Sequence, residues 1–478
     1  MPELTKIQTG LLDAQGPFHI EDGHNGAPGI AFEGDTDTGL TRSADGEISV
    51  VSNATTRLKA NADSLHVEFD HPVIQPTLNF DFANTKALDP RINFRRDSIA
   101  TYVGADGLIK TAGVGEPRFD HDPLTGECLG LLMERGRTNV LGNSQNLTDN
   151  NGNDWDNVNG VIATNQTTAP DGTTTAASFT ASAGNAEHSV VFAELVPQGS
   201  VSVSIWIKPN TYSIVSFVLY GEANSTVSYN LSTKTVYNQL SNVSAASITE
   251  YPNGWYRIVA TMNCSVANSR VFRLFAGTGN FSASGTESFY YWGPQLESGS
   301  YATSYIPTTE SNVSVTRGQD HADMFDSNIS SWFNESGGTI TFDFNPKQYV
   351  PTTDGTRLFK FDNSNIAGDT RIDYVISTSG SYQPYLAYGG SSYYGGASSI
   401  GFTKDTEFKI ALTIKENDIV GYINGSQSLN DTTMTMFMPN RFLIGSNGPN
   451  GFSINGYIRN MKYYSRRLSN DYLSYITS

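Results

Sequence analysis

The chain is poor in cysteine, in charge and in long apolar runs. Its 478 residues include two cysteines, Cys128 and Cys264, too few for a disulfide framework or a four-thiolate metal site. No apolar run approaches the ~18 residues of a membrane-spanning helix, and the first residues lack the pattern of a signal peptide. We therefore expect no cofactor, no membrane insertion and no conventional secretion.

Basic residues are also scarce. The chain has 30 Lys and Arg against 47 Asp and Glu, a net charge of −17. Such a surface repels a polyanion, so nucleic acid is excluded as an expected partner. The seven histidines are scattered singly, and the G-x-S-x-G, Walker A and H-E-x-x-H motifs are missing. We expect no metal site and no enzyme.

What the chain does have is glycine (45), tyrosine (24) and phenylalanine (25). Turn residues combined with aromatic residues predict a mainly β protein. We divide it into a thin N-terminal fibrous or attachment segment (1–70), a connector (71–141) and two β-sandwich domains (142–318 and 319–478). The strands of the first segment are too short to fold alone, so we expect identical chains to share a core there.

Strict alternation of apolar and polar residues defines the two sandwiches. Residues 201–208 and 255–264 alternate in the first sandwich, which places Cys264 in its core. Residues 339–344 and 408–414 alternate in the second. The dipeptide Asn424-Gly425 predicts a tight hairpin there, because both positions accept positive φ.

Six strings carry a resemblance. The C-terminal strings RFLIGS (441–446) and INGYIRNMKYYSRRLSNDYL (454–473) resemble the closing strands of concanavalin A-like or laminin-G-like jelly rolls. The string GPQLESGSYATSYIPT (293–308) resembles the end of a carbohydrate-binding-like sandwich. The string PGIAFEGDTDTGL (28–40) and the connector strings at 99–113 and 115–141 resemble segments of tailed-bacteriophage fibre or spike proteins.

The resemblance implies a structural virion appendage on the particle surface. Its implied partners are two further copies of itself in a homotrimer, other virion proteins at the N-terminus, and host-surface glycan at the C-terminal sandwiches. Two alternatives stay open: a polysaccharide depolymerase or glycosidase tailspike, and a capsid head fibre or decoration protein without a defined receptor.

Three groups of polar residues are candidate sites by residue type. A glucanase of the jelly-roll type needs paired carboxylates on one strand, and Asp343 stands alone, so we interpret it as solvent-facing. The string Asp120-His121-Asp122 lies among Pro and Gly and is interpreted as a structural turn. Six residues form either an interchain ion-pair network or a solvated loop: Arg91, Arg95, Arg96, Glu134, Arg135 and Arg137.

The predicted glycan or receptor site is a tyrosine-rich segment. Flat rings at a sandwich edge stack on the apolar faces of sugars. The candidates are Tyr382, Tyr385, Tyr388, Tyr393 and Tyr394. The alternative is that Tyr382 and Tyr388 pack across the sheet. A calcium site formed by Asp405, Asp418 and Asp431 is a weaker alternative.

Overall fold

The computed structural model describes residues 20–62, 65–67, 74–147, 155–192, 196–267, 271–347, 356–376, 382–394, 404–448 and 453–478. The chain forms two compact units, residues 1–75 (unit 1) and 76–478 (unit 2). Strands dominate both units, and unit 2 contains two β-sandwiches, so the predicted fold class is confirmed. No helix among the described residues is long and apolar enough to cross a membrane.

Unit 1 contains one antiparallel sheet in the order β3-β4-β5-β6-β7. Its strands are β3 (Ile30–Phe32), β4 (Asp35–Thr41), β5 (Ile48–Ser52), β6 (Thr55–Ala60) and β7 (Leu65–Val67). The short strands β1 (Gly23–His24) and β2 (Ala27–Pro28) form a hairpin, and Thr41 donates a hydrogen bond to the carbonyl oxygen of Asp22 just before that hairpin.

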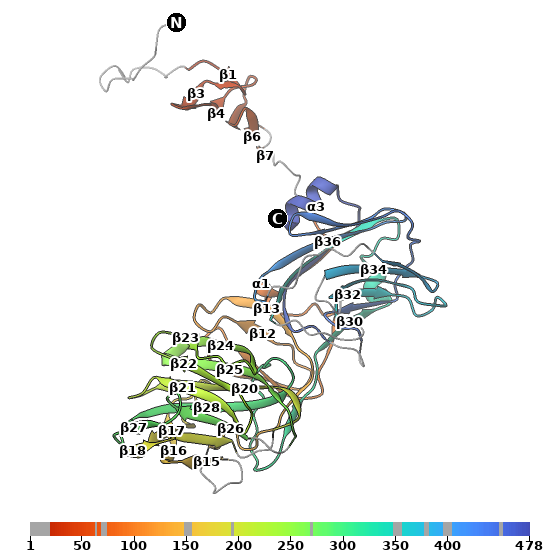
Figure 1. Cartoon of the computed structure of the whole chain (residues 1–478). Coiled ribbons are helices and arrows are strands. Elements are labelled where there is room, and N and C mark those ends of the chain that lie inside the picture. The colour runs from red at the N-terminus through yellow and green to blue at the C-terminus, as the bar shows by residue number, and fades with distance from the viewer. Residues whose placement is uncertain are drawn as a thin grey trace, which may run out of the picture. The chain divides into compact units, whose positions relative to one another are not determined.

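The middle sandwich of unit 2 has two sheets in the part of the chain that the structure describes (Figure 1). The first is ordered β15 (Trp155–Val158), β19 (Ser189–Phe192), β26 (Val271–Ala276), β21 (Ile214–Tyr220), β22 (Thr226–Asn230), β23 (Thr235–Tyr237). The second is ordered β16 (Gly160–Thr167), β17 (Ala176–Ala181), β28 (Ser288–Ser298), β20 (Gly199–Pro209), β25 (Trp255–Cys264), β24 (Val243–Tyr251). A short pair, β18 (Gly184–Ala186) and β27 (Phe281–Ala283), flanks them.

The alternation of apolar and polar residues in β20 and β25 places the apolar side chains in the core, as the sequence predicts. Val201 and Ile205 lie in the core between the two sheets, and Cys264 is buried there with them. Trp206, one residue out of phase, lies on the other face of β20 in a separate aromatic cluster with Trp292 and Tyr305. The sheet therefore buries both of its faces around β20.

The C-terminal sandwich also has two sheets among the described residues. One is ordered β35 (Ser391–Tyr394), β34 (Tyr382–Tyr388), β33 (Arg371–Ile376), β32 (Thr356–Asp362), β39 (Arg441–Ile444), β30 (His321–Phe325), β9 (Asn93–Arg95). The other is ordered β12 (Phe119–His121), β13 (Cys128–Met133), β40 (Gly456–Tyr464), β31 (Gly338–Pro346), β36 (Phe408–Ile414), β37 (Ile419–Ile423), β38 (Ser426–Asp431), and β8 (Leu78–Asp81) also pairs with β40. Helix α3 (Asn470–Thr477) packs on β36 and β37.

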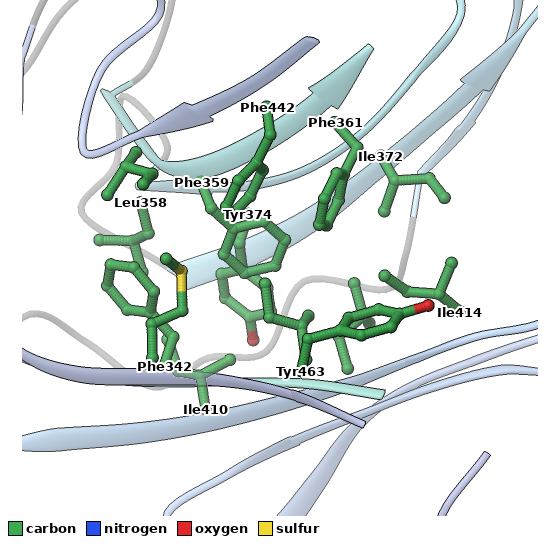
Figure 2. Close-up of a cluster of buried hydrophobic side chains, with 14 of the residues drawn as sticks. Phe342, Leu358, Phe359, Phe361, Ile372, Tyr374, Ile410, Ile414, Phe442 and Tyr463 are labelled. Atoms are coloured by element: carbon green, nitrogen blue, oxygen red, sulfur yellow. The ribbon is translucent and has the colours of Figure 1, made fainter. Parts of the chain in front are cut away.

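The core of this sandwich is aromatic. Figure 2 shows side chains of the two sheets pointing toward one another, Phe342 and Ile410 from one and Phe361 and Phe442 from the other. The predicted hairpin at Asn424-Gly425 is present, with φ of 45° and 77°. Local alternation and turn chemistry therefore specified these elements correctly.

Residues 71–141 do not stand apart from the sandwiches. Strands β8, β9, β12 and β13 all pair with strands of the C-terminal sandwich. The hairpin of β10 (Ala100–Val103) and β11 (Ile109–Ala112) contributes side chains to the aromatic cluster around Trp206. Two short strands, β14 (Arg137–Asn139) and β29 (Val315–Arg317), pair where the chain enters and leaves the middle sandwich. In Figure 1 the orange strands β12 and β13 lie between the green middle sandwich and the blue C-terminal one.

Candidate functional site

A buried cluster of charged residues joins the connector to the strand that follows the middle sandwich. We name it the ionic cluster: Arg96, Arg118, Glu134, Arg317 and Asp320. Arg118 donates to Glu134 Oε2 at 2.8 Å through Nη1 and to Asp320 Oδ2 at 2.6 Å through Nη2. Each of these three side chains is at most 3% exposed. Arg96 lies 3.1 Å from the other Asp320 oxygen.

The ionic cluster keeps its charges in spite of burial. Burial by itself would raise the pKa of Glu134, but Arg317 and Arg118, with hydrogen bonds from Ser304, hold it well below the ordinary value. A carboxylate held ionised in this way cannot donate a proton as a general acid near neutral pH. The cluster is therefore a structural joint between segments about 200 residues apart in sequence.

The suggested interchain network is wrong for Arg96 and Glu134, whose ionic partners belong to the same chain. Arg91 pairs with Asp89 two residues away. Sequence reasoning missed Asp320, the residue that binds both Arg96 and Arg118, because an isolated aspartate carries no local signal. Only the course of the chain brings it to these arginines.

The Asp120-His121-Asp122 string forms structural contacts. Asp122 accepts hydrogen bonds from the backbone amides of Leu124 at 2.9 Å and Thr125 at 2.8 Å, which is the expected turn. Asp120 is buried and accepts from the Tyr457 hydroxyl at 2.7 Å. Within the described ranges no group of three His, Cys, Asp or Glu side chains is placed to hold a metal ion.

The position of Asp343 differs from the solvent-facing one that the sequence predicts. It is half-buried, not solvent-facing, and accepts a hydrogen bond from the Asn460 amide on the neighbouring strand β40. Burial, with a smaller contribution from Glu407, raises the pKa of Asp343 to about 6. The residue therefore covers the outer face of its sheet and shares a strand-to-strand hydrogen bond there.

The three aspartates considered for calcium are engaged separately. Asp418 forms an ion pair with Arg467 at 3.0 Å. Asp431 accepts from the backbone amides of Thr433 and Met434, as in a turn. Asp405 lies 3.6 Å from Lys404. These contacts are those of ordinary turn and surface carboxylates.

The tyrosine-rich segment forms the edge hairpin of β34 and β35. Tyr385 pairs in register with Tyr394. Tyr388 packs against the hydrophobic core, as the alternative interpretation expected of it. The side chains of Tyr382, Tyr393 and Tyr394 fall outside the described residues. The predicted glycan role of all five stays a prediction.

Tyr385 lies in a small polar cluster at this edge. The guanidinium of Arg371 stacks over its ring, 4.1 Å from the centroid, and its hydroxyl lies 3.4 Å from Asp369 Oδ2. Arg371 also pairs with Asp369 at 3.3 Å. These contacts fix the half-buried tyrosine ring while the Asp369 side chain stays 41% exposed. We name this group the edge cluster: Tyr385, Arg371 and Asp369.

The chain matches no protein-family model, and no curated protein is similar to it in sequence. Among solved structures, it is similar to domain 4 of a GH43 extracellular arabinanase from Geobacillus stearothermophilus in complex with arabinotriose, at 16% identity and a TM-score of 0.29, covering 34% of this chain and 73% of that one. A CBM40 domain of the Ruminococcus gnavus IT-sialidase, bound to alpha2,3 sialyllactose, matches at 16% identity and a TM-score of 0.28. The match covers 32% of this chain and 91% of that one. A Trypanosoma rangeli sialidase matches at 11% identity and a TM-score of 0.26, and the match covers 69% of this chain and 65% of that one. These likenesses are weak and carry no argument about what this chain binds.

Proposed function

We propose that the protein is a non-enzymatic, homotrimeric appendage of a tailed-phage particle that binds host-surface glycan through its C-terminal sandwich. The observation that carries the glycan-binding part is the edge cluster. Its tyrosine ring is held in place by a guanidinium and a carboxylate, so little conformational entropy is lost when a sugar stacks on it. The partly exposed carboxylate of Asp369 has free lone pairs that accept hydrogen bonds from sugar hydroxyls.

The edge cluster is tested by binding to purified capsule or lipopolysaccharide of the host. Tyr385→Ala is expected to weaken binding by about tenfold or more, because it removes the stacking surface and frees its two charged neighbours. The matched control is Tyr475→Ala, which removes a tyrosine that is 58% exposed on α3. Unchanged binding by Tyr385→Ala would exclude this edge as the site.

The trimeric part of the proposal is supported by one face of the sheet in unit 1. Ile30, Leu40, Val50 and Leu58 are register partners on four successive strands, so their side chains form a row on one face. Ile30 is 47% and Val50 38% exposed. A sheet with an apolar face needs a second layer to bury it, and a copy of the same chain supplies an apolar row of the same length.

Light scattering is expected to give a mass of three chains of 51.9 kDa each. Val50→Glu is expected to shift the protein toward monomer, because it places a carboxylate from each copy into the shared core. Val161→Glu in the middle sandwich, where the valine is 62% exposed, is the control and should leave the mass unchanged. A monomeric parent protein would contradict the shared core.

The depolymerase alternative is tested in the same samples. Release of reducing ends from the host polysaccharide would replace the non-enzymatic proposal with a glycosidase.

The place of the protein on the particle is tested by labelling intact virions with an antibody against residues 319–478. Label at the capsid would indicate a head fibre, and label at the tail would indicate a tail fibre.

A further inference from the structure

A second group of three side chains in unit 2 repeats the edge cluster in another sheet. The guanidinium of Arg273 in β26 lies over the ring of Tyr220 in β21, 3.7 Å from its centroid, and pairs with Glu187 at 3.7 Å. We name this group the face cluster: Tyr220, Arg273 and Glu187. Strands β21 and β26 belong to the first sheet of the middle sandwich, whereas the edge cluster belongs to the C-terminal sandwich (Figure 1).

The two clusters share their geometry as well as their composition. In each, the tyrosine stands two positions from the register partner of the arginine on the neighbouring antiparallel strand. That partner is Val218 for Arg273 and Ala387 for Arg371. In each cluster the arginine side chain is 18% exposed and the carboxylate side chain 41% exposed. The chain therefore builds the same surface arrangement twice, in two different sheets.

The face cluster lies on the outer side of its sheet. The residues immediately before and after Arg273 belong to the core, so Arg273 points away from the core. Its register partners Val191 and Val218 share its face of the sheet and are half-exposed. Tyr220 is 46% exposed. An open and partly apolar surface therefore adjoins the tyrosine ring.

The polar groups of the face cluster are not used within the protein. The guanidinium of Arg273 donates no hydrogen bond to a described residue, and its contact with Glu187 at 3.7 Å is longer than a hydrogen bond. Nε of Arg273 is closed off from solvent, whereas Nη1 and Nη2 are not. The Glu187 carboxylate likewise accepts no hydrogen bond from the described part of the chain and is partly exposed. Arginine in a folded protein normally donates several hydrogen bonds, so these groups can receive a ligand.

The chemistry of the face cluster fits a sugar. Of two adjacent hydroxyls on a pyranose ring, one can accept from a guanidinium and the other can donate to a carboxylate, while the apolar face of the ring stacks on tyrosine. Asp156 adds a second carboxylate to the same face of the sheet, because it is the register partner of Val191. Two carboxylates beside one guanidinium disfavour an anionic sugar.

We propose that the face cluster is a second saccharide-binding site, which takes a neutral sugar through two adjacent hydroxyls. The hydroxyls bridge Arg273 and Glu187, and the sugar ring stacks on Tyr220. The parallel with the edge cluster rests on the proposed function, but the unused donors and acceptor of the face cluster do not. Two sites on each chain strengthen attachment to a repeating polysaccharide, since the second contact is made at a high effective concentration.

The test is calorimetric titration of the full chain with maltotriose, cellotriose and mannotriose, which are neutral, and with the acidic trigalacturonate. One of the neutral trisaccharides is expected to bind saturably, and more tightly than trigalacturonate. Tyr220→Ala should weaken binding at this site by about tenfold or more, because it removes the stacking surface. Glu187→Gln should weaken binding about three- to tenfold, because a neutral amide is a poorer acceptor than a carboxylate.

A conservative variant and the edge cluster provide the controls. Tyr220→Phe keeps the ring and should bind as the parent does, with an unchanged melting temperature. Tyr385→Ala separates the two clusters. If the edge cluster binds the same sugar, Tyr385→Ala and Tyr220→Ala each lose one of two sites per chain, and the double variant loses both. If the edge cluster does not bind it, Tyr385→Ala leaves the titration unchanged, and the face cluster accounts for the one site.

Three outcomes would overturn the proposal. The first is that none of the neutral trisaccharides binds. The second is that Tyr220→Ala keeps the number of sites and the affinity of the parent, which would leave the edge cluster and the proposed function untouched. The third is that trigalacturonate binds more tightly than the neutral sugars at the site that Tyr220→Ala removes. A parent protein that binds a neutral trisaccharide through Tyr220 but does not bind host polysaccharide would support the face cluster and contradict the proposed function alone.

Discussion

Replacing Arg118 with methionine is expected to lower the free energy of unfolding of unit 2 by about 3–5 kcal/mol, the usual cost of removing one partner of a buried ion pair. The guanidinium is fully buried and binds Glu134 and Asp320 together. Without it, two carboxylates remain buried beside each other with less positive charge to compensate them. Urea denaturation at pH 7, followed by tryptophan fluorescence, measures the change.

The loss should depend on pH in a defined direction. The pKa of Glu134 is lower in the folded protein than in the unfolded chain, so its contribution to stability is present above the unfolded pKa and is lost as the pH falls. Removing Arg118 takes away part of what lowers that pKa. The difference in stability between parent and variant should therefore be largest at pH 7 and smaller near pH 4.

Two controls separate burial from charge. Arg459→Met removes an arginine whose ion pair with Glu127 is partly exposed. This substitution should lower the free energy of unfolding by no more than about 1 kcal/mol. The triple variant Arg118→Met, Glu134→Gln, Asp320→Asn should recover much of the loss, because no unpaired carboxylate is then left inside. A triple variant as unstable as Arg118→Met alone would show that packing, not charge, makes the arginine necessary.

Phe361→Ala should destabilise the C-terminal sandwich by about 3–5 kcal/mol. The ring stacks on Phe442 with centroids 4.3 Å apart and an angle of 14°, and it also contacts Phe333 and Trp332 (Figure 2 shows the stacked pair). Its removal leaves a cavity that rigid neighbouring rings cannot fill. Chemical denaturation and the melting temperature report the loss.

The control for Phe361 is Phe325→Ala. Phe325 lies in β30 of the same sheet but is 37% exposed, so its removal should cost far less. Phe361→Leu should fall between the two, because it retains much of the apolar volume. Equal losses for Phe361→Ala and Phe325→Ala would contradict the assignment of the core.

The candidate sites were predictable to different degrees. The tyrosine edge could be found from sequence because tyrosine, glycine and serine are concentrated in one short segment, yet Tyr388 proved to pack against the core. Its position in the alternation, in phase with Leu386, is the signal that separates it from Tyr385. The ionic cluster left no such signal, because its residues come from distant segments.

What the sequence by itself determined is local. Apolar and polar residues alternate along 201–208 and 339–344, and Asn424-Gly425 forms a tight turn. These patterns are enough to define the strands, their buried faces and the mainly β fold, because each depends on residues only a few positions apart.

The tertiary structure decided everything that depends on contacts between distant segments. Asp320 meets Arg118 across about 200 residues, and Ser304 meets Glu134 across 170, because both sandwiches pack against strands of the connector. Such pairings follow from the path of the whole chain and from the burial of charge that this path imposes. No spacing in the sequence encodes them.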